Sequence, residues 1–291
     1  MRHFHVFFSP VLPPPITAYK STGVSTDLTI ARLKRQPNLL EDGGMFCIED
    51  MTVVTPDTLL VSNRSKKCVQ LVDSRQGQVL SEVQLQGAPG RMCLTDRNTA
   101  AVVIWGQKKI QMIQMKDNTL TLGKVLTVIE DIQAITSSRN SLVVSYDKLP
   151  WLEVISIDEQ VLNQFDRTGN PHLLKNPAFM CTSPDESIFI SDYGTNKITK
   201  VDAQLNILRR FTSPLLQDPR GITARTEDEI LVCSRENNSL VLIQPSTNKI
   251  STFLEKNDWL DRLYTLTYCP DKKKIYIAPS RVGTIEVYQI T

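Results

Sequence analysis

Apolar and polar positions along this chain follow a repeating order of short alternating runs separated by polar turns. The clearest copy contains four such runs, at 219–222, 229–234, 238–243 and 250–253. The preceding copy matches it run for run, at 176–180, 188–192, 196–201 and 207–211. Alternation with a period of two is typical of half-buried strands, and the turn residues between the runs fit antiparallel connections. The pattern therefore predicts units of four antiparallel strands.

The unit recurs six times along the chain, at a spacing of roughly forty residues that is typical of propeller blades. Blades of four antiparallel strands arranged about a central channel form one closed ring. We therefore predict an all-β fold, a six-bladed β-propeller of four-stranded antiparallel blades that occupies residues 28–291 as one domain. Residues 1–27 include prolines at 10, 13, 14 and 15 and are predicted to form an extended or disordered N-terminal tail.

The last copy has three strand-like runs instead of four, at 263–266, 275–278 and 285–288. A blade that ends after three strands leaves an exposed edge at the point where the ring must close. The segment 28–34 lies just before the first blade and alternates as a strand does. We predict that this segment is the closing strand of the last blade.

Charge and cysteine content narrow the range of partners and compartments. The formal net charge of +2 gives no overall field that would require nucleic acid or an anionic membrane as partner. The six cysteines form no CxxC pair and are expected to be free, buried thiols, which fits a reducing compartment. The prolines of the tail interrupt its apolar run too early for a signal peptide, and no transmembrane stretch occurs. We expect a monomeric ring in the cytoplasm, with no membrane partner.

Ring topology sorts the loops into two faces. Because successive strands are antiparallel, the loops that join the second and third strands of a blade share one face with the loops between blades. This face, called the basic face below, collects many Lys and Arg residues, and loops on a rigid scaffold are common places for binding residues. The predicted partner-binding residues, near the mouth of the channel on this face, are Arg64, Arg91, Tyr193, Arg220, Arg235 and Arg281.

Two turn motifs connect the repeat to a known family. The turn 191–196 reads Ser-Asp-Tyr-Gly-Thr-Asn, and the inner strand of the next copy begins with Pro-Arg-Gly-Ile at 219–222. Third strands begin with Asn-Lys-Ile at 196–198 and Asn-Ser-Leu at 238–240, relaxed forms of an Asn-His-Leu tripeptide that lack the histidine. From about residue 46 onward the chain resembles NHL-repeat β-propellers, and it is similar to the C-terminal ring of tripartite-motif proteins of the NHL class.

The residues of these motifs also have physical roles that need no family. Asp192 and Asn196 are predicted to accept hydrogen bonds from the backbone of their own turn, two residues on. Gly90 and Gly221 are predicted to let the backbone turn sharply where it approaches the central channel. Both roles are structural.

The resemblance implies a non-catalytic, protein-binding ring, the substrate- or partner-recognition part of a tripartite-motif-like ubiquitin ligase system. Full-length members of that class place a RING finger, B-box zinc modules and a coiled coil before the ring. This chain has no Cys/His series with zinc spacing and no long heptad run before residue 46, so it is expected to supply recognition alone. We predict a protein partner on the face that carries Arg91 and Arg220, without metal or cofactor.

The first alternative is single-stranded RNA binding on the basic face, which some NHL rings perform. Such binding needs a positive groove and exposed aromatic rings for base stacking. The aromatic candidates in or near the loops are few: Tyr146, Trp151 and Tyr193.

The second alternative is a metal-dependent hydrolase or lyase of the six-bladed type, in which ligands converge from the starts of the inner strands. Glu49 and Asp50 are nearly all that these positions offer here. Of the three histidines, His3 and His5 lie in the tail and His172 lies in a loop between blades. No GxSxG, HExxH or phosphate-binding glycine loop occurs, so catalysis is not expected.

Overall fold

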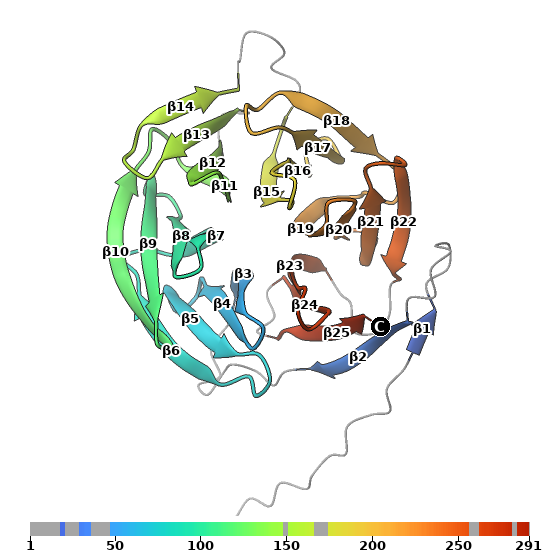
Figure 1. The fold of residues 1–291 in the computed structure, drawn as a ribbon, viewed down its shortest axis with the longest axis horizontal. Coiled ribbons are helices and arrows are strands. Elements are labelled where there is room, and N and C mark those ends of the chain that lie inside the picture. The colour runs from blue at the N-terminus through green and yellow to red at the C-terminus, as the bar shows by residue number, and fades with distance from the viewer. Residues whose placement is uncertain are drawn as a thin grey trace, which may run out of the picture.

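A computed structural model describes residues 18–20, 29–35, 47–147, 151–165, 174–255, 262–280 and 284–290. These residues form 25 strands in six antiparallel sheets, which are arranged as blades in a closed ring (Figure 1). The described part of the chain contains no helix. The predicted all-β, six-bladed β-propeller is therefore confirmed.

The first three blades follow one another around the ring, each running from an inner to an outer strand. Blade 1 contains β3 (Ile48–Thr55), β4 (Thr58–Asn63), β5 (Cys68–Asp73) and β6 (Val79–Gln84). Blade 2 contains β7 (Pro89–Asp96), β8 (Thr99–Ile104), β9 (Lys109–Lys116) and β10 (Thr119–Thr127). Blade 3 contains β11 (Ile132–Ser138), β12 (Ser141–Tyr146), β13 (Leu152–Ser156) and β14 (Val161–Gln164).

The remaining blades complete the circle. Blade 4 contains β15 (Pro177–Thr182), β16 (Ile188–Asp192), β17 (Lys197–Val201) and β18 (Ile207–Thr212). Blade 5 contains β19 (Pro219–Thr226), β20 (Glu229–Ser234), β21 (Ser239–Gln244) and β22 (Lys249–Leu254). Blade 6 contains β23 (Leu263–Cys269), β24 (Lys274–Pro279) and β25 (Glu286–Ile290), followed outward by β2 (Thr29–Arg35) and β1 (Ala18–Lys20).

The apolar pattern of each strand follows its place in the blade. The middle strands are covered on both faces by neighbouring blades, so β4 is buried throughout and β5 along all but its last residue. The outer strand β6 alternates between half-buried and exposed residues, because only one of its faces packs against protein. The inner strands are longer than predicted: the runs expected at 219–222 and 263–266 belong to β19 and β23, which extend to Thr226 and Cys269.

The hydrophobic core lies between the blades and not at the centre of the ring. One cluster joins blades 1, 2 and 6, and four others each fill the space between two neighbouring blades. Blades 4 and 5, for example, meet through Phe189, Phe211 and Val232, which are at most 1% exposed. The interior of the ring is therefore left to the inner strands and their polar side chains.

The N-terminal part of the chain lies at the seam of the ring. β2 pairs antiparallel with β25, from Ile30 opposite Ile290 to Arg35 opposite Glu286, and the C-terminal end lies beside this pair (Figure 1). The predicted closing strand at 28–34 thus corresponds to β2, which begins and ends one residue later in the sequence. Of the predicted tail, residues 18–20 form β1, which pairs with β2, and the rest lies outside the described residues.

The turn between second and third strands has the same geometry in four blades. Its last residue takes a left-handed φ in each: Lys67 (53°), Lys108 (53°), Asn196 (55°) and Asn238 (49°). Asparagine tolerates this region better than most residues, which gives a physical reason for the asparagine that begins the motifs at 196 and 238.

The side chains of the motif residues connect neighbouring segments. Asp192 accepts a hydrogen bond from the amide of Gly194 in its own turn at 3.0 Å, as predicted, and also from the amides of Lys175 and Asn176. Asn196 was predicted to accept a hydrogen bond within its own turn, and this prediction was wrong. Its Oδ1 accepts a hydrogen bond from the Asp218 amide of the next blade at 2.9 Å.

Gly90 and Gly221 are needed for close packing, which corrects the prediction that they permit a sharp turn. Neither residue has a positive φ. A Cβ on Gly90 would lie 2.7 Å from Nε1 of Trp105, and a Cβ on Gly221 would lie 2.7 Å from the Cα of Thr265. The second contact is with the backbone of the next inner strand, which cannot move aside as a side chain can.

Replacement of Gly221 by alanine should therefore lower the free energy of unfolding by about 3 kcal/mol, the upper end of the cost of overpacking a rigid core. The matched control is Gly123→Ala in β10, where the nearest atom would be 3.2 Å away and a smaller loss is expected. Urea unfolding of both variants measures the difference. Equal losses in the two variants would show that the approach of β19 to β23 is not tight.

Candidate functional site

The ring has two separate cavities along its axis, one lined mainly by loops at the mouth and one lined by the inner strands. The mouth pocket, of about 610 Å³, opens on the basic face and is lined by Cys47, Glu49, Arg64, Arg235, Glu236, Asn238, Arg262, Tyr264 and Ser280. The channel cavity, of about 190 Å³, is lined by residues of all six inner strands, among them Asp50, Arg91, Thr136, Thr182, Thr223 and Thr267. The two cavities share no lining residue.

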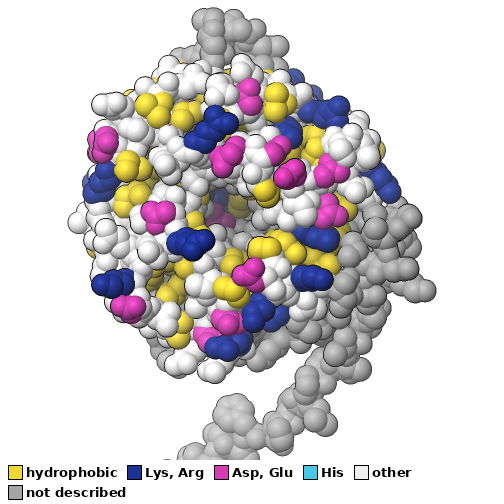
Figure 2. All heavy atoms as spheres, viewed as in Figure 1, with side chains coloured by type: hydrophobic (Ala, Val, Ile, Leu, Met, Phe, Trp, Pro, Cys, Tyr) yellow, Lys and Arg dark blue, Asp and Glu magenta, His cyan; other side chains and the backbone are white. Residues whose placement is uncertain are grey.

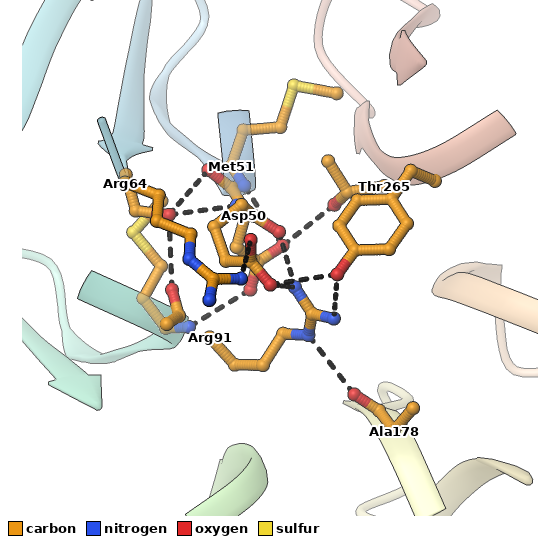
Figure 3. Close-up of polar contacts among 11 residues, drawn as sticks. Asp50, Met51, Arg64, Arg91, Ala178 and Thr265 are labelled. Carbon is orange, nitrogen blue, oxygen red and sulfur yellow. Dashed lines mark hydrogen bonds and ion pairs between the residues drawn. The ribbon is translucent and has the colours of Figure 1, made fainter. Parts of the chain in front are cut away.

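Arg91 of β7 lies between the two cavities and is 3% exposed. Its Nη1 donates to a carboxylate oxygen of Glu49 at 3.0 Å, its Nη2 donates to the Tyr264 hydroxyl at 2.9 Å, and its Nε donates to the Ala178 carbonyl at 3.1 Å (Figure 3). The guanidinium also stacks on the Phe179 ring, 3.6 Å from its centroid. These contacts come from blades 1, 4 and 6, so the Arg91 side chain spans the channel.

Glu49 and Tyr264 complete this layer and form the floor of the mouth pocket. The Tyr264 hydroxyl donates to Glu49 Oε1 at 2.8 Å, so that carboxylate oxygen accepts from both Tyr264 and Arg91. Glu49 is 2% exposed, and a buried carboxylate is stable only with such charged and hydrogen-bonding partners. The Glu49 charge is therefore balanced within the protein.

Asp50, the next residue of β3, faces the channel cavity below this layer. One of its carboxylate oxygens accepts from the Met92 amide at 2.9 Å, and the other accepts from the Met51 amide and from the Thr265 hydroxyl at 2.7 Å (Figure 3). Burial raises the pKa of the Asp50 carboxyl above its usual value, against the opposing effect of Arg91. Both carboxyl oxygens have protein partners, which fits a role in joining blades 1, 2 and 6.

Arg64 stands at the rim of the mouth pocket, in the turn between β4 and β5. Its guanidinium lies 5.7 Å from the centroid of the Trp105 ring and 3.6 Å from a Glu49 carboxylate oxygen. Its side chain is 53% exposed, and it forms no hydrogen bond with any residue that the structure describes. Arg64 thus presents its donors to the pocket.

Two of the predicted binding residues, Arg220 and Arg235, meet at the buried carboxylate of Asp218, and a third, Tyr193, contacts Arg220. Nε of Arg220 lies 2.8 Å from Asp218 Oδ1, and Nε of Arg235 lies 2.5 Å from Asp218 Oδ2. The Arg220 guanidinium also covers the Tyr193 ring at 3.8 Å. Arg235 reaches the mouth pocket, whereas Arg220 is only 13% exposed and holds Tyr193 in place.

The structure therefore distributes the predicted residues over two levels. Arg64, Tyr193, Arg220 and Arg235 lie around the mouth, and Arg91 lies beneath it as a buried part of the floor instead of at the surface. Arg281 lies outside the described residues. Sequence analysis missed Trp105, Arg262 and Tyr264 as parts of the site, although Trp105 and Arg262 occupy the loop positions that define the basic face.

Charges on the face shown in Figure 2 are mixed. Basic and acidic side chains are interspersed around the central hollow, and neither sign forms a continuous band. This arrangement agrees with the formal net charge of +2.

The part of the chain that the structure covers has no group of three or more His, Cys, Asp or Glu residues that could hold a metal ion. All three histidines lie outside that part. None of the six cysteines forms a disulfide, and burial raises the pKa of Cys68 and of Cys181 to about 12. Within the same residues, no helix is long and apolar enough to cross a membrane.

Comparison with known proteins identifies the fold. No protein-family model matches the chain, and no curated protein matches its sequence. A streptogramin B lyase structure is similar over 91% of this chain and 98% of its own, with a TM-score of 0.66 and 11% sequence identity. A catalytically inactive virginiamycin B lyase from Staphylococcus aureus, solved with quinupristin, is similar over 91% and 100% of the two chains, with a TM-score of 0.65 and 12% identity.

The propeller domain of another protein is about as similar. The β-propeller domain of Cps50 (Swd1) from Myceliophteria thermophila matches 84% of this chain and 83% of its own, with a TM-score of 0.61 and 12% identity. Identities this low establish a shared propeller fold alone. A fold that carries both lyases and a propeller domain of another kind leaves function to be argued from the site.

Proposed function

We propose that this protein is a non-catalytic recognition module that binds a protein partner on the basic face, with the mouth pocket at the centre of the contact. The observation that carries the proposal is the set of arginine and aromatic side chains around that pocket. Arg64, which lines the pocket, lies over Trp105, and Arg220, which shares the Asp218 carboxylate with the pocket residue Arg235, lies over Tyr193. Tryptophan, tyrosine and arginine are the residues most enriched at the energetic centres of protein interfaces.

The aromatic contacts favour protein over RNA. Of the three aromatic residues predicted as stacking candidates, Tyr146 is 1% exposed, and Trp151 packs edge-on against it with 6.2 Å between ring centroids. The third, Tyr193, is covered by Arg220 at 3.8 Å. Base stacking needs open ring faces, and these three rings are already engaged.

The carboxylates of the channel favour binding over catalysis. A catalytic metal needs several ligands with free lone pairs, but Glu49 is held by Arg91 and Tyr264, and Asp50 is held by two backbone amides and Thr265. This arrangement supports a channel that is a structural centre, in a fold that some other proteins use for lyase chemistry.

The resemblance to NHL rings gives the proposal its cellular setting. In this setting the ring is the recognition part of a tripartite-motif-like ubiquitin ligase system and acts in the cytoplasm as a monomer, without metal or cofactor. Six cysteines without a disulfide, four of them buried, fit a compartment in which thiols stay reduced.

The test is affinity capture from native cells treated with RNase, using the wild-type ring, the variant Arg64→Glu/Arg235→Glu, and the control Arg97→Glu/Lys116→Glu. The control makes the same charge change at exposed residues on the opposite face. The basic-face variant should reduce the yield of specific partners at least about tenfold, since reversed charges at an interface cost several kcal/mol, while the control retains them. Thermal melting confirms that both variants fold.

The same partners in all three captures, or partners lost only from the control, would contradict the proposal. Loss of every specific partner on RNase treatment would favour the RNA alternative instead.

A further inference from the structure

The mouth pocket has an excess of cationic donors that the protein does not use. Three arginines line it, from three different loops: Arg64 between β4 and β5, Arg235 between β20 and β21, and Arg262 before β23. Arg262 is exposed, and its side chain has no ion pair with any described residue. The ion pair of Arg64 within the described part of the chain is the 3.6 Å contact with Glu49. Two guanidinium groups therefore point at the pocket with most of their donors open.

The acidic residues of the pocket do not cancel these charges. Glu49 is balanced by Arg91 at 3.0 Å and by the Tyr264 hydroxyl, so the floor is close to neutral. Glu236 is exposed at the rim and is the only other acid among the lining residues. The upper part of the pocket thus has a positive character, although the molecule as a whole carries a formal charge of only +2.

The depth and size of the pocket define what can enter it. Its volume of about 610 Å³ lies within the range of specific ligand sites. The Arg91 layer stops a ligand at the floor, because the channel cavity beneath shares no lining residue with the pocket. An extended chain that crosses the face can therefore insert one or two side chains, but it cannot pass through the ring.

We infer that the mouth pocket binds an acidic peptide segment, with Asp or Glu side chains inserted between Arg64 and Arg262. This inference rests on the proposed function and specifies the chemistry of the partner. Arginine is suited to it, because its planar fork donates two parallel hydrogen bonds to one carboxylate. Contact of Arg64 with Trp105 restricts the Arg64 side chain, so less conformational freedom is lost when a carboxylate binds.

The test uses fluorescence anisotropy with three labelled probes: an end-blocked peptide of Glu, Asp and Ser, the same peptide with Gln and Asn in place of the acids, and a single-stranded RNA of equal charge. The proteins are the full chain, the variant Arg64→Gln/Arg262→Gln, and the control Arg97→Gln/Lys116→Gln. Wild type should bind the acidic peptide at least about tenfold more tightly than the amide peptide, and the mouth variant should lose at least about tenfold of that affinity. The control should stay within about twofold of wild type.

Equal affinity for the acidic and amide peptides, an unchanged mouth variant, or tighter binding of the RNA would overturn the inference. These outcomes are separate from failure of the proposed function. If capture from cells remains sensitive to Arg64→Glu/Arg235→Glu while the acidic peptide does not bind, then the partner uses the basic face through other chemistry, and only the acidic-segment inference falls.

Discussion

Replacement of Arg91 by methionine is expected to lower the free energy of unfolding by about 3–5 kcal/mol, the usual cost of removing one partner from a buried ion pair. Methionine retains much of the apolar volume against Phe179 but leaves the Glu49 carboxylate, at 2% exposure, without its 3.0 Å cationic partner. It also removes a donor from the Tyr264 hydroxyl and the link to the Ala178 carbonyl. Urea unfolding measures the loss.

Two further variants separate the effect of lost charge on stability from the effect of lost packing. The double variant Glu49→Gln/Arg91→Met removes both charges and should recover part of the loss, because no uncompensated charge remains in the channel. Arg97→Met in the exposed loop of the same blade should change stability by less than about 0.5 kcal/mol. A single variant Arg91→Met as stable as Arg97→Met would show that the Arg91 layer is not what holds blades 1, 4 and 6 together.

Deletion of residues 1–35 is expected to lower the midpoint of thermal unfolding by on the order of 10 °C. The deletion removes β2 and leaves β25 as an open edge, so five paired positions, from Ile30 opposite Ile290 to Arg35 opposite Glu286, are lost. At about 1 kcal/mol for each net backbone hydrogen bond, the loss is several kcal/mol, and each kcal/mol shifts the midpoint of a domain of this size by about 2–4 °C.

Deletion of residues 1–17 is the matched control, because it leaves β1 and β2 in place and should not move the midpoint. A synthetic peptide of residues 28–35 added to the long deletion should restore part of the stability in a concentration-dependent way, since it binds only the folded ring. If the long deletion melts at the wild-type temperature, β2 does not close the ring.

The architecture could be predicted because its signals are local. Each middle strand is a short apolar run between polar turns, and the three-run copy at the end of the chain revealed that a fourth strand had to come from elsewhere. The boundaries of the inner strands were harder to predict, because these strands contain both polar and apolar residues where they line the channel. β19, for example, was predicted at 219–222 and extends to Thr226.

The candidate site was predictable only in part, for a related reason. Loop position tells which face a residue lies on but not how far it lies from the axis, so Arg91 was grouped with exposed arginines. Its partners Glu49 and Tyr264 are 42 and 173 residues away in sequence, and they meet it because the ring closes. No local sequence pattern predicts that Arg91 pairs with Glu49 and Tyr264. Glu49 and Asp50 were recognised as the acids of the inner strand starts, but their engagement by donors from other blades was not visible.

The Arg91 layer blocks the channel of the ring between its two openings. A molecule that binds at one opening must leave by the same opening. The ring therefore cannot slide along a polymer threaded through it, and the dissociation rate depends on the contacts at the rim. The cavities on the two sides of the Arg91 layer share no lining residue, so a molecule seated in the mouth pocket leaves the channel cavity free.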